Sequence, residues 1–179
     1  MTKPFADFKE DLRLFCSENK VDNDKISIVG VSKKKSLEDI LGLYRLGLRD
    51  FGENYAQELL EKESLVPEDI NWHFIGQIQS NKIRKVSHIV STWHSVTSIK
   101  IAKEIHRRNE GVSILLQVSI KGPSNSKGFK IEEIPNVVNE LRNEGVNLSG
   151  LMTMGVPEDK DCLLYTSDAA DEGLGVDLG

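Results

Sequence analysis

The sequence is poor in the residues and patterns that mark several common protein classes. Its two cysteines, Cys16 and Cys162, are too few for a disulfide framework or a cysteine-based metal site. No apolar run approaches the roughly 20 residues of a membrane-spanning helix, and the N-terminus lacks the apolar core of a signal peptide. We therefore expect a cytoplasmic protein with no bound metal and no membrane contact.

An excess of positive charge and a dinucleotide-binding turn are also missing. The formal net charge of −5 argues against general binding to the phosphate backbone of nucleic acids. No Gly-x-Gly-x-x-Gly turn follows the first apolar run, which weakens the nucleotide-binding version of an open α/β sheet. We expect no nucleic-acid partner.

The sequence does contain a regular alternation of strand-length apolar runs and helical patterns. The expected strands cover residues 26–31, 49–54, 71–76, 88–93, 113–120 and 147–153. The expected helices cover 37–46, the region of Leu59 and Leu60, a segment capped by Ser80 or Asn81, and residues 99–108 and 131–143. Such alternation with short connections predicts a parallel sheet with helices outside it.

Two architectures satisfy this alternation: an open doubly wound sheet and a (β/α)8 barrel of the TIM type. Polar side chains follow the C-terminal ends of several different strands, namely Lys33, Asn54, His73, Gln117 and Thr153. A barrel assembles its functional site at that face from the ends of many strands. We therefore favour the barrel, with about six of its eight strands present.

A lysine cluster directly follows the first apolar run. Residues 26–31 lead into Ser32, Lys33, Lys34 and Lys35, which places a lysine at the mouth of the expected barrel. A neutral lysine amine forms Schiff bases with carbonyl groups, and neighbouring positive charges favour the neutral form of Lys33. Three lysines are equally typical of a solvated basic turn. The residues alone leave both interpretations open.

The segment 162–179 differs in character from the rest of the chain. Residues 162–172 and 176–179 resemble a translation, in one consistent frame, of the two constant parts of a transposase adapter used in short-read sequencing. Such segments are kept out of fold reasoning. We therefore expect 162–179 to be a non-native, disordered tail and 1–161 to be an incomplete barrel domain.

Several short motifs occur together in a characteristic order. They are Val31-Ser32-Lys33, Phe51-Gly52-Glu53-Asn54-Tyr55, Trp72-His73-Phe74-Ile75-Gly76, Gln79-Ser80-Asn81-Lys82, Ser126-Lys127-Gly128 and Gly150-Leu151-Met152. This set resembles the pyridoxal phosphate homeostasis proteins, the YggS-like or PROSC-like family, over residues 5–158. The resemblance implies a barrel like the N-terminal barrel of alanine racemase, standing alone with pyridoxal 5′-phosphate (PLP) at its mouth.

The resemblance also implies roles for individual residues. Lys33 matches the lysine that holds PLP as a reversible Schiff base, Lys35 a second basic position, and Lys127 a lysine in the loop after the fifth strand. Asn54 and His73 match strand ends that face the cofactor ring. Asn54 could equally cap the following helix, and His73 could be a packed histidine. No residue is assigned a catalytic role.

The function implied by the resemblance is that of a monomeric carrier or regulator of free PLP that serves apo-PLP enzymes, not a turnover enzyme. The phosphate is expected at loops after strands seven and eight, which this sequence lacks, so we expect weak PLP binding. Two alternatives stay open. One is a PLP-dependent enzyme of the racemase or decarboxylase type, and the other is a barrel that binds a different phosphorylated ligand without covalent chemistry.

Overall fold

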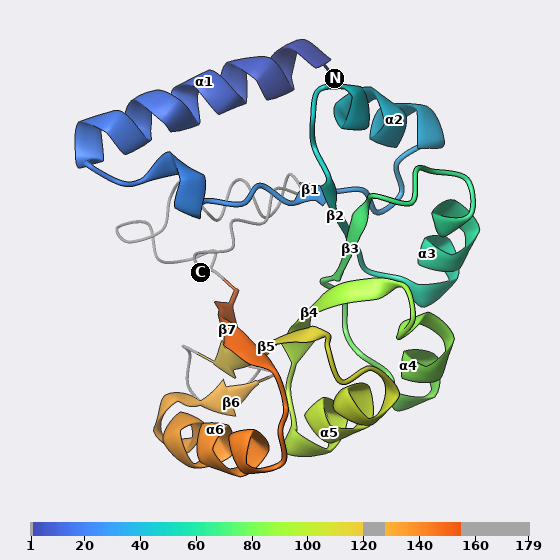
Figure 1. The fold of residues 1–179 in the computed structure, drawn as a ribbon, viewed down its shortest axis with the longest axis vertical. Coiled ribbons are helices and arrows are strands. Elements are labelled where there is room, and N and C mark those ends of the chain that lie inside the picture. The colour runs from blue at the N-terminus through green and yellow to red at the C-terminus, as the bar shows by residue number, and fades with distance from the viewer. Residues whose placement is uncertain (1, 120–127, 155–179) are drawn as a thin grey trace.

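A curved and entirely parallel sheet forms the frame of the molecule (Figure 1). The computed structural model describes residues 2–119 and 128–154; Lys127, the boundary expected at residue 161 and the tail expected at 162–179 lie outside these residues. The strands are β1 (Gly30–Val31), β2 (Asp50–Glu53), β3 (Asn71–Phe74), β4 (Val90–Val96), β5 (Ser113–Ser119), β6 (Phe129–Lys130) and β7 (Leu148–Thr153).

Five helices connect the described strands and cover the outer side of the sheet: α2 (Leu37–Arg45), α3 (Ala56–Glu63), α4 (Ser80–Val86), α5 (Ile99–Arg108) and α6 (Ile134–Asn143). A further helix, α1 (Thr2–Asn19), precedes the first strand, and there are two short 3-10 turns, η1 (Asn23–Lys25) and η2 (Ile131–Glu133). Within the described residues, no helix is long and apolar enough to cross a membrane.

The order of the strands decides between the two expected architectures. The sheet runs β1-β2-β3-β4-β5 in chain order, and β7 pairs with β5. A doubly wound sheet reverses its order at a switch point and carries helices on both faces. Here α2 to α6 all lie on the outer side of the curve (Figure 1), as in a barrel wall. The barrel prediction is therefore confirmed.

The core lies between the strands and these outer helices. Trp72, Phe74 and Trp93 are buried there, and the rings of Phe74 and Trp93 are 5.0 Å apart. Ile83 of α4 and Ile105 of α5 belong to the same apolar cluster. Side chains alternate along a strand, so His73, which lies between Trp72 and Phe74 in β3, points to the inner side of the curve. Trp72 and Trp93 are therefore packing residues of this core.

Some expected boundaries are wrong. The first strand covers only Gly30–Val31, because its ladder with β2 starts at the pair Gly30 and Phe51. The apolar residues 26–29 lie before that ladder and are not part of the strand. The fourth strand starts at Val90 and not at His88, since Ile89 N–H still donates to Val86 O in the turn after α4.

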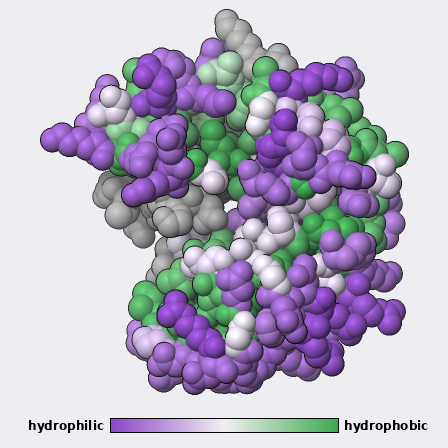
Figure 2. All heavy atoms as spheres, in the orientation of Figure 1, coloured by the Kyte–Doolittle hydropathy of each residue, from purple (hydrophilic) through white to green (hydrophobic). Residues whose placement is uncertain are grey.

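The start of α4 and the presence of α1 and β6 also differ from expectation. The α4 helix is preceded by Gln79, with no side-chain cap, so the capping role expected for Ser80 or Asn81 is wrong. Neither α1 nor the two-residue β6 is expected from apolar patterns. Most α1 side chains are exposed, and the helix crosses the open side of the sheet (Figure 1). Figure 2 shows mostly hydrophilic residues over the outer helices and hydrophobic ones in the hollow between α1 and α2.

Candidate functional site

The Lys33 turn is short and fixed at both ends. Ser32 N–H donates to Gly52 O at 3.0 Å and extends the β1–β2 ladder by one residue, while Lys35 N–H donates to Ser32 O at 3.0 Å. Ser36 then begins α2 with a reciprocal capping box to Asp39. Lys33 is half-buried and Lys35 is exposed. The structure thus places the expected lysine on a constrained turn at the C-terminal edge of the sheet.

Asn54 lies at the same edge as Lys33. Val31 pairs with Gly52, and Lys33 and Asn54 each follow these partners by two positions. The Oδ1 atom of Asn54 is buried and has no hydrogen-bond partner in the part of the chain that the structure describes. The residue before α3 is Tyr55, without a side-chain cap, so the alternative in which Asn54 caps that helix is wrong.

The C-terminal ends of the later strands reach the same edge. Gln117 is buried in β5 opposite Met152, and Thr153 at the end of β7 donates from Oγ1 to Val118 O at 3.2 Å. Lys127, the remaining expected site residue, is outside the described residues. The structure therefore brings Lys33, Lys35 and Asn54 to one rim together with the ends of β5 and β7.

His73 occupies a different level, inside β3, and forms the centre of a polar chain. Its Nε2 lies 3.0 Å from Asp50 Oδ1 and its Nδ1 lies 2.8 Å from His94 Nε2. A carboxylate only accepts, so Nε2 of His73 carries a proton, and in neutral His73 the Nδ1 atom accepts from His94. Both ring nitrogens of His73 are engaged, which is the geometry of the packed-histidine alternative.

The surroundings lower the pKa values of Asp50 and His94, the two residues that flank His73. The hydrogen bond from His73 lowers the pKa of Asp50. Burial, with a smaller contribution from the charge of His73, lowers the pKa of His94 from 6.5 to about 4. At neutral pH His94 is therefore an uncharged hydrogen-bonding group. The sequence offers no signal for this hydrogen-bonded trio, because Asp50, His73 and His94 come from three different strands.

A second buried polar cluster lies behind the Lys33 turn and was not expected. Lys62 of α3 contacts Glu53 and Glu58 at 2.7 Å each, and Ser32 Oγ donates to Glu53 Oε1 at 2.7 Å. Burial raises the pKa of Glu53, while the bonds from Lys62 and Ser32 oppose that shift. The spacing of Glu58 and Lys62 suggests an exposed helix pair; the tertiary fold buries it.

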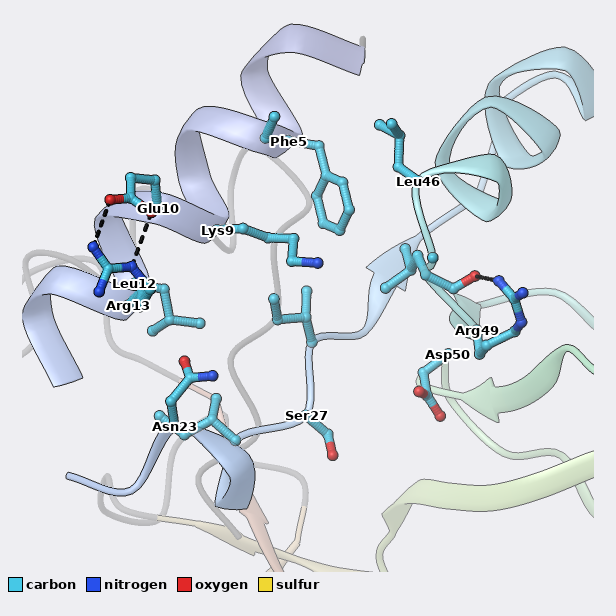
Figure 3. Close-up of a pocket in the computed structure, with 15 residues that line it drawn as sticks. Phe5, Lys9, Glu10, Leu12, Arg13, Asn23, Ser27, Leu46, Arg49 and Asp50 are labelled. Atoms are coloured by element: carbon cyan, nitrogen blue, oxygen red, sulfur yellow. Dashed lines mark hydrogen bonds and ion pairs between the residues drawn. The ribbon is translucent and has the colours of Figure 1, made fainter. Parts of the chain in front are cut away.

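A cavity of about 660 Å³ lies between α1 and the N-terminal ends of β1 and β2 (Figure 3). Phe5 and Lys9 of α1 point into it, and Asp50 lies on the opposite wall. The cavity is at the other end of the strands from the Lys33 turn, so it is not the expected cofactor mouth. Among the described residues, no group of three or more histidine, cysteine or acidic side chains could hold a metal ion.

The chain is similar to curated proteins named pyridoxal phosphate homeostasis protein. It is 33% identical over 159 residues to the one from Pseudomonas aeruginosa, covering 86% of this chain and 69% of the relative. It is 40% identical over 142 residues to the one from Caenorhabditis elegans, covering 72% and 58%. Across such relatives the chain spans 58% to 70% of their lengths. No protein-family model matches it.

The fold is also similar to that of several solved structures. A protein of unknown function from Bifidobacterium adolescentis superposes with a TM-score of 0.80 at 26% identity, covering 88% of this chain and 70% of that one. PipY of Synechococcus elongatus, solved with PLP bound, gives 0.69 at 25% identity, covering 90% and 77%. Alanine racemase of Clostridium difficile shares the fold alone, with 0.62 at 16% identity, covering 90% and 44%. The chain therefore belongs to the pyridoxal phosphate homeostasis protein family.

Proposed function

We propose that this chain binds PLP at the rim formed by the Lys33 turn and acts in PLP homeostasis as a carrier or regulator, without turnover of a substrate. The observation that carries the proposal is the position of Lys33. It sits on a constrained turn directly after β1, at the C-terminal mouth of a barrel wall. The support from relatives is their name and the PLP-bound structure of PipY.

The described residues suit an aldehyde cofactor that carries a phosphate. Lys33 offers the amine, and Lys35 adds a positive charge in the same exposed turn. Asn54, which follows β2 at this rim, has a buried Oδ1 atom without a partner in the described chain, and a ligand donor would satisfy it. We propose His73 as a deeper support of the cofactor ring, and Lys127 as a further basic contact from outside the described residues.

The chemistry at the rim is a reversible condensation. Lys33 would hold PLP through its amine, to which the cofactor would supply an aldehyde carbon; the C=N bond would form with loss of one water. The same reaction in reverse releases the cofactor, as a carrier requires. The protein's contribution is to hold the amine at a fixed place and to keep the cofactor oriented through polar contacts.

Borohydride trapping tests the proposal. PLP is added to the full chain, the mixture is reduced, and the modified peptides are identified by mass analysis. We expect the adduct on Lys33. The Lys33→Ala variant should lose it, and Lys34→Ala, a change at the exposed next residue, should keep it. Labelling spread evenly over exposed lysines would contradict the proposal and favour a barrel that binds a phosphorylated ligand without covalent chemistry.

The finer parts of the proposal concern the cellular setting and the extent of the domain. We propose a cytoplasmic monomer that passes PLP to apo-enzymes, in line with a reversible bond to the carrier. We also propose that residues 1–161 carry the function and that 162–179 do not. Sedimentation of the purified protein tests the monomer. The nucleotide sequence of the gene tests the tail, since synonymous codons that differ from the adapter would refute its assignment.

A further inference from the structure

Three side chains outside the expected site converge on the backbone that carries Lys33. Glu53 ends β2, and Glu58 and Lys62 lie one turn apart on α3. The side chain of Glu53 has 0% of its surface exposed and that of Lys62 has 8%, whereas Glu58 retains 21%. Charged side chains are rarely buried to this degree unless they are paired. Here Glu53 is paired through Oε1, while its buried Oε2 has no partner among the described residues.

The first contact of this cluster is with the residue before Lys33. Lys62 Nζ donates to Ser32 O at 2.6 Å and to Glu53 Oε1 at 2.7 Å. The same Glu53 oxygen accepts from Ser32 Oγ at 2.7 Å. With the bond from Ser32 N–H to Gly52 O, all three polar groups of Ser32 are tied to β2 or α3. Ser32 therefore has little freedom to move relative to the sheet.

The second contact is with the residue after Lys33. Lys34 N–H donates to Glu58 Oε1 at 2.5 Å, and the same oxygen accepts from Lys62 Nζ at 2.7 Å. Lys34 has a φ of 58°, in the left-handed region that is unfavourable for a residue with a side chain. The charge-assisted bond that Lys34 N–H donates to Glu58 offsets that cost. The turn around Lys33 is thus held in a conformation that its own sequence does not favour.

We propose that Glu53, Glu58 and Lys62 are positioning residues that clamp the backbone on both sides of Lys33 and so set where its amine meets an aldehyde. The inference rests on the proposed function of Lys33. Reaction at a fixed amine avoids the entropic cost of ordering the turn at the moment of bond formation. A buried ion pair adds little net stability, so a role in conformational specificity accounts better for its retention.

The test compares variants of the full chain that are graded by burial. Glu58→Ala removes the acceptor of Lys34 N–H from a partly exposed position, so the fold should survive. Glu58→Gln keeps an oxygen acceptor and serves as the rescue. Glu61→Ala is the matched control, because this exposed carboxylate on the same helix accepts from Gln57 and not from the turn. A double variant, Glu53→Leu with Lys62→Met, removes both members of the buried pair together and leaves only the partly exposed Glu58, which still accepts from Lys34 N–H.

Two measurements are made on each variant. The first is amide hydrogen exchange at Lys34 and Lys35, which reports the order of the turn without any cofactor. The second is the rate of adduct formation on Lys33 with PLP, relative to that on Lys34 in the same sample. We expect Glu58→Ala to exchange at least about tenfold faster at Lys34, the loss of one charge-assisted bond. The double variant should exchange faster at Lys35, whose N–H donates to the Ser32 O that Lys62 also holds. In both variants the relative rate at Lys33 should also fall about tenfold.

The outcomes separate this inference from the proposed function. Exchange as slow as in the parent, or faster exchange with an unchanged relative rate at Lys33, overturns the clamp. Equal effects of Glu58→Ala and Glu61→Ala also overturn it. If the parent forms no adduct on Lys33, the proposed function is wrong, and so is the claim that the three residues affect the reactivity of Lys33. The exchange rates still test separately whether these residues order the backbone of the turn.

Discussion

Replacing His94 with glutamine should remove most of the acid sensitivity of this fold between pH 7.5 and 4.5. His94 is 5% exposed, and its Nε2 lies 2.8 Å from His73 Nδ1. A glutamine Nε2 can occupy the same place and donate to His73, but it cannot take up a proton. The substitution therefore retains the hydrogen bond and deletes the titration.

The expected magnitude follows from the lowered pKa of His94. In the unfolded chain the imidazole has a pKa of 6.5, and in the folded state burial and the charge of His73 lower it to about 4. Between these values the unfolded state binds more protons, so the free energy of unfolding falls as the pH falls. The contribution is fully present above pH 6.5, and about 2.5 kcal/mol of it is lost between pH 7.5 and 4.5.

Urea unfolding followed by tryptophan fluorescence measures this loss, because the buried Trp93 is adjacent to His94. The comparison between parent and variant cancels the contribution of Glu53, whose raised pKa acts in the opposite direction. His88→Gln is the control at an exposed histidine and should follow the parent. If His94→Gln loses as much stability as the parent over this range, the assignment of His94 as a buried neutral base is wrong.

Other predictions concern the backbone and are checked by the same unfolding assay. Lys20→Gly should stabilise the protein by about 0.5–1 kcal/mol, because Lys20 directly follows α1 with a φ of 55°; no gain would contradict this reasoning. Gly76→Ala should cost about 3 kcal/mol or more, since its Cβ would lie 2.2 Å from Asn54 O. Gly42→Ala, in open space on α2, should instead gain up to about 1 kcal/mol, and equal effects would refute the contrast. Ser36→Ala should lose about 1 kcal/mol with its capping box, and an unchanged midpoint would argue against that cap.

Apolar periodicity predicts the elements that bury a full face. The helix expected over 99–108 has the bounds of α5, and β5 follows a continuous apolar run that starts where expected. Periodicity fails where burial is slight or pairing decides. The first apolar run is strand only where β2 lies beside it, and α1 buries little of its surface.

Residues of the candidate site likewise differ in whether a local sequence signal or the tertiary fold determines their position. Lys33 can be predicted from sequence because the signals for it are local: a lysine directly after an apolar run, within the motif Val31-Ser32-Lys33. Lys62 cannot be found that way, since a lysine four residues after Glu58 on a helix normally lies in solvent. Its burial depends on Glu53 and on Ser32, which are brought to it by the β1–β2 ladder. Likewise, Asp50 and His94 join His73 only through strand register.

The sequential pairing of the strands has a consequence for synthesis. Gly30 pairs with Phe51, and Phe51 with Trp72, so each strand from β2 to β6 binds the one that left the ribosome just before it, and β7 binds β5. The sheet can therefore grow from its N-terminal side, one strand and helix at a time. At each stage the newest strand presents its open edge to the cell, and that edge is the place where a neighbouring nascent chain could add on before the next strand arrives.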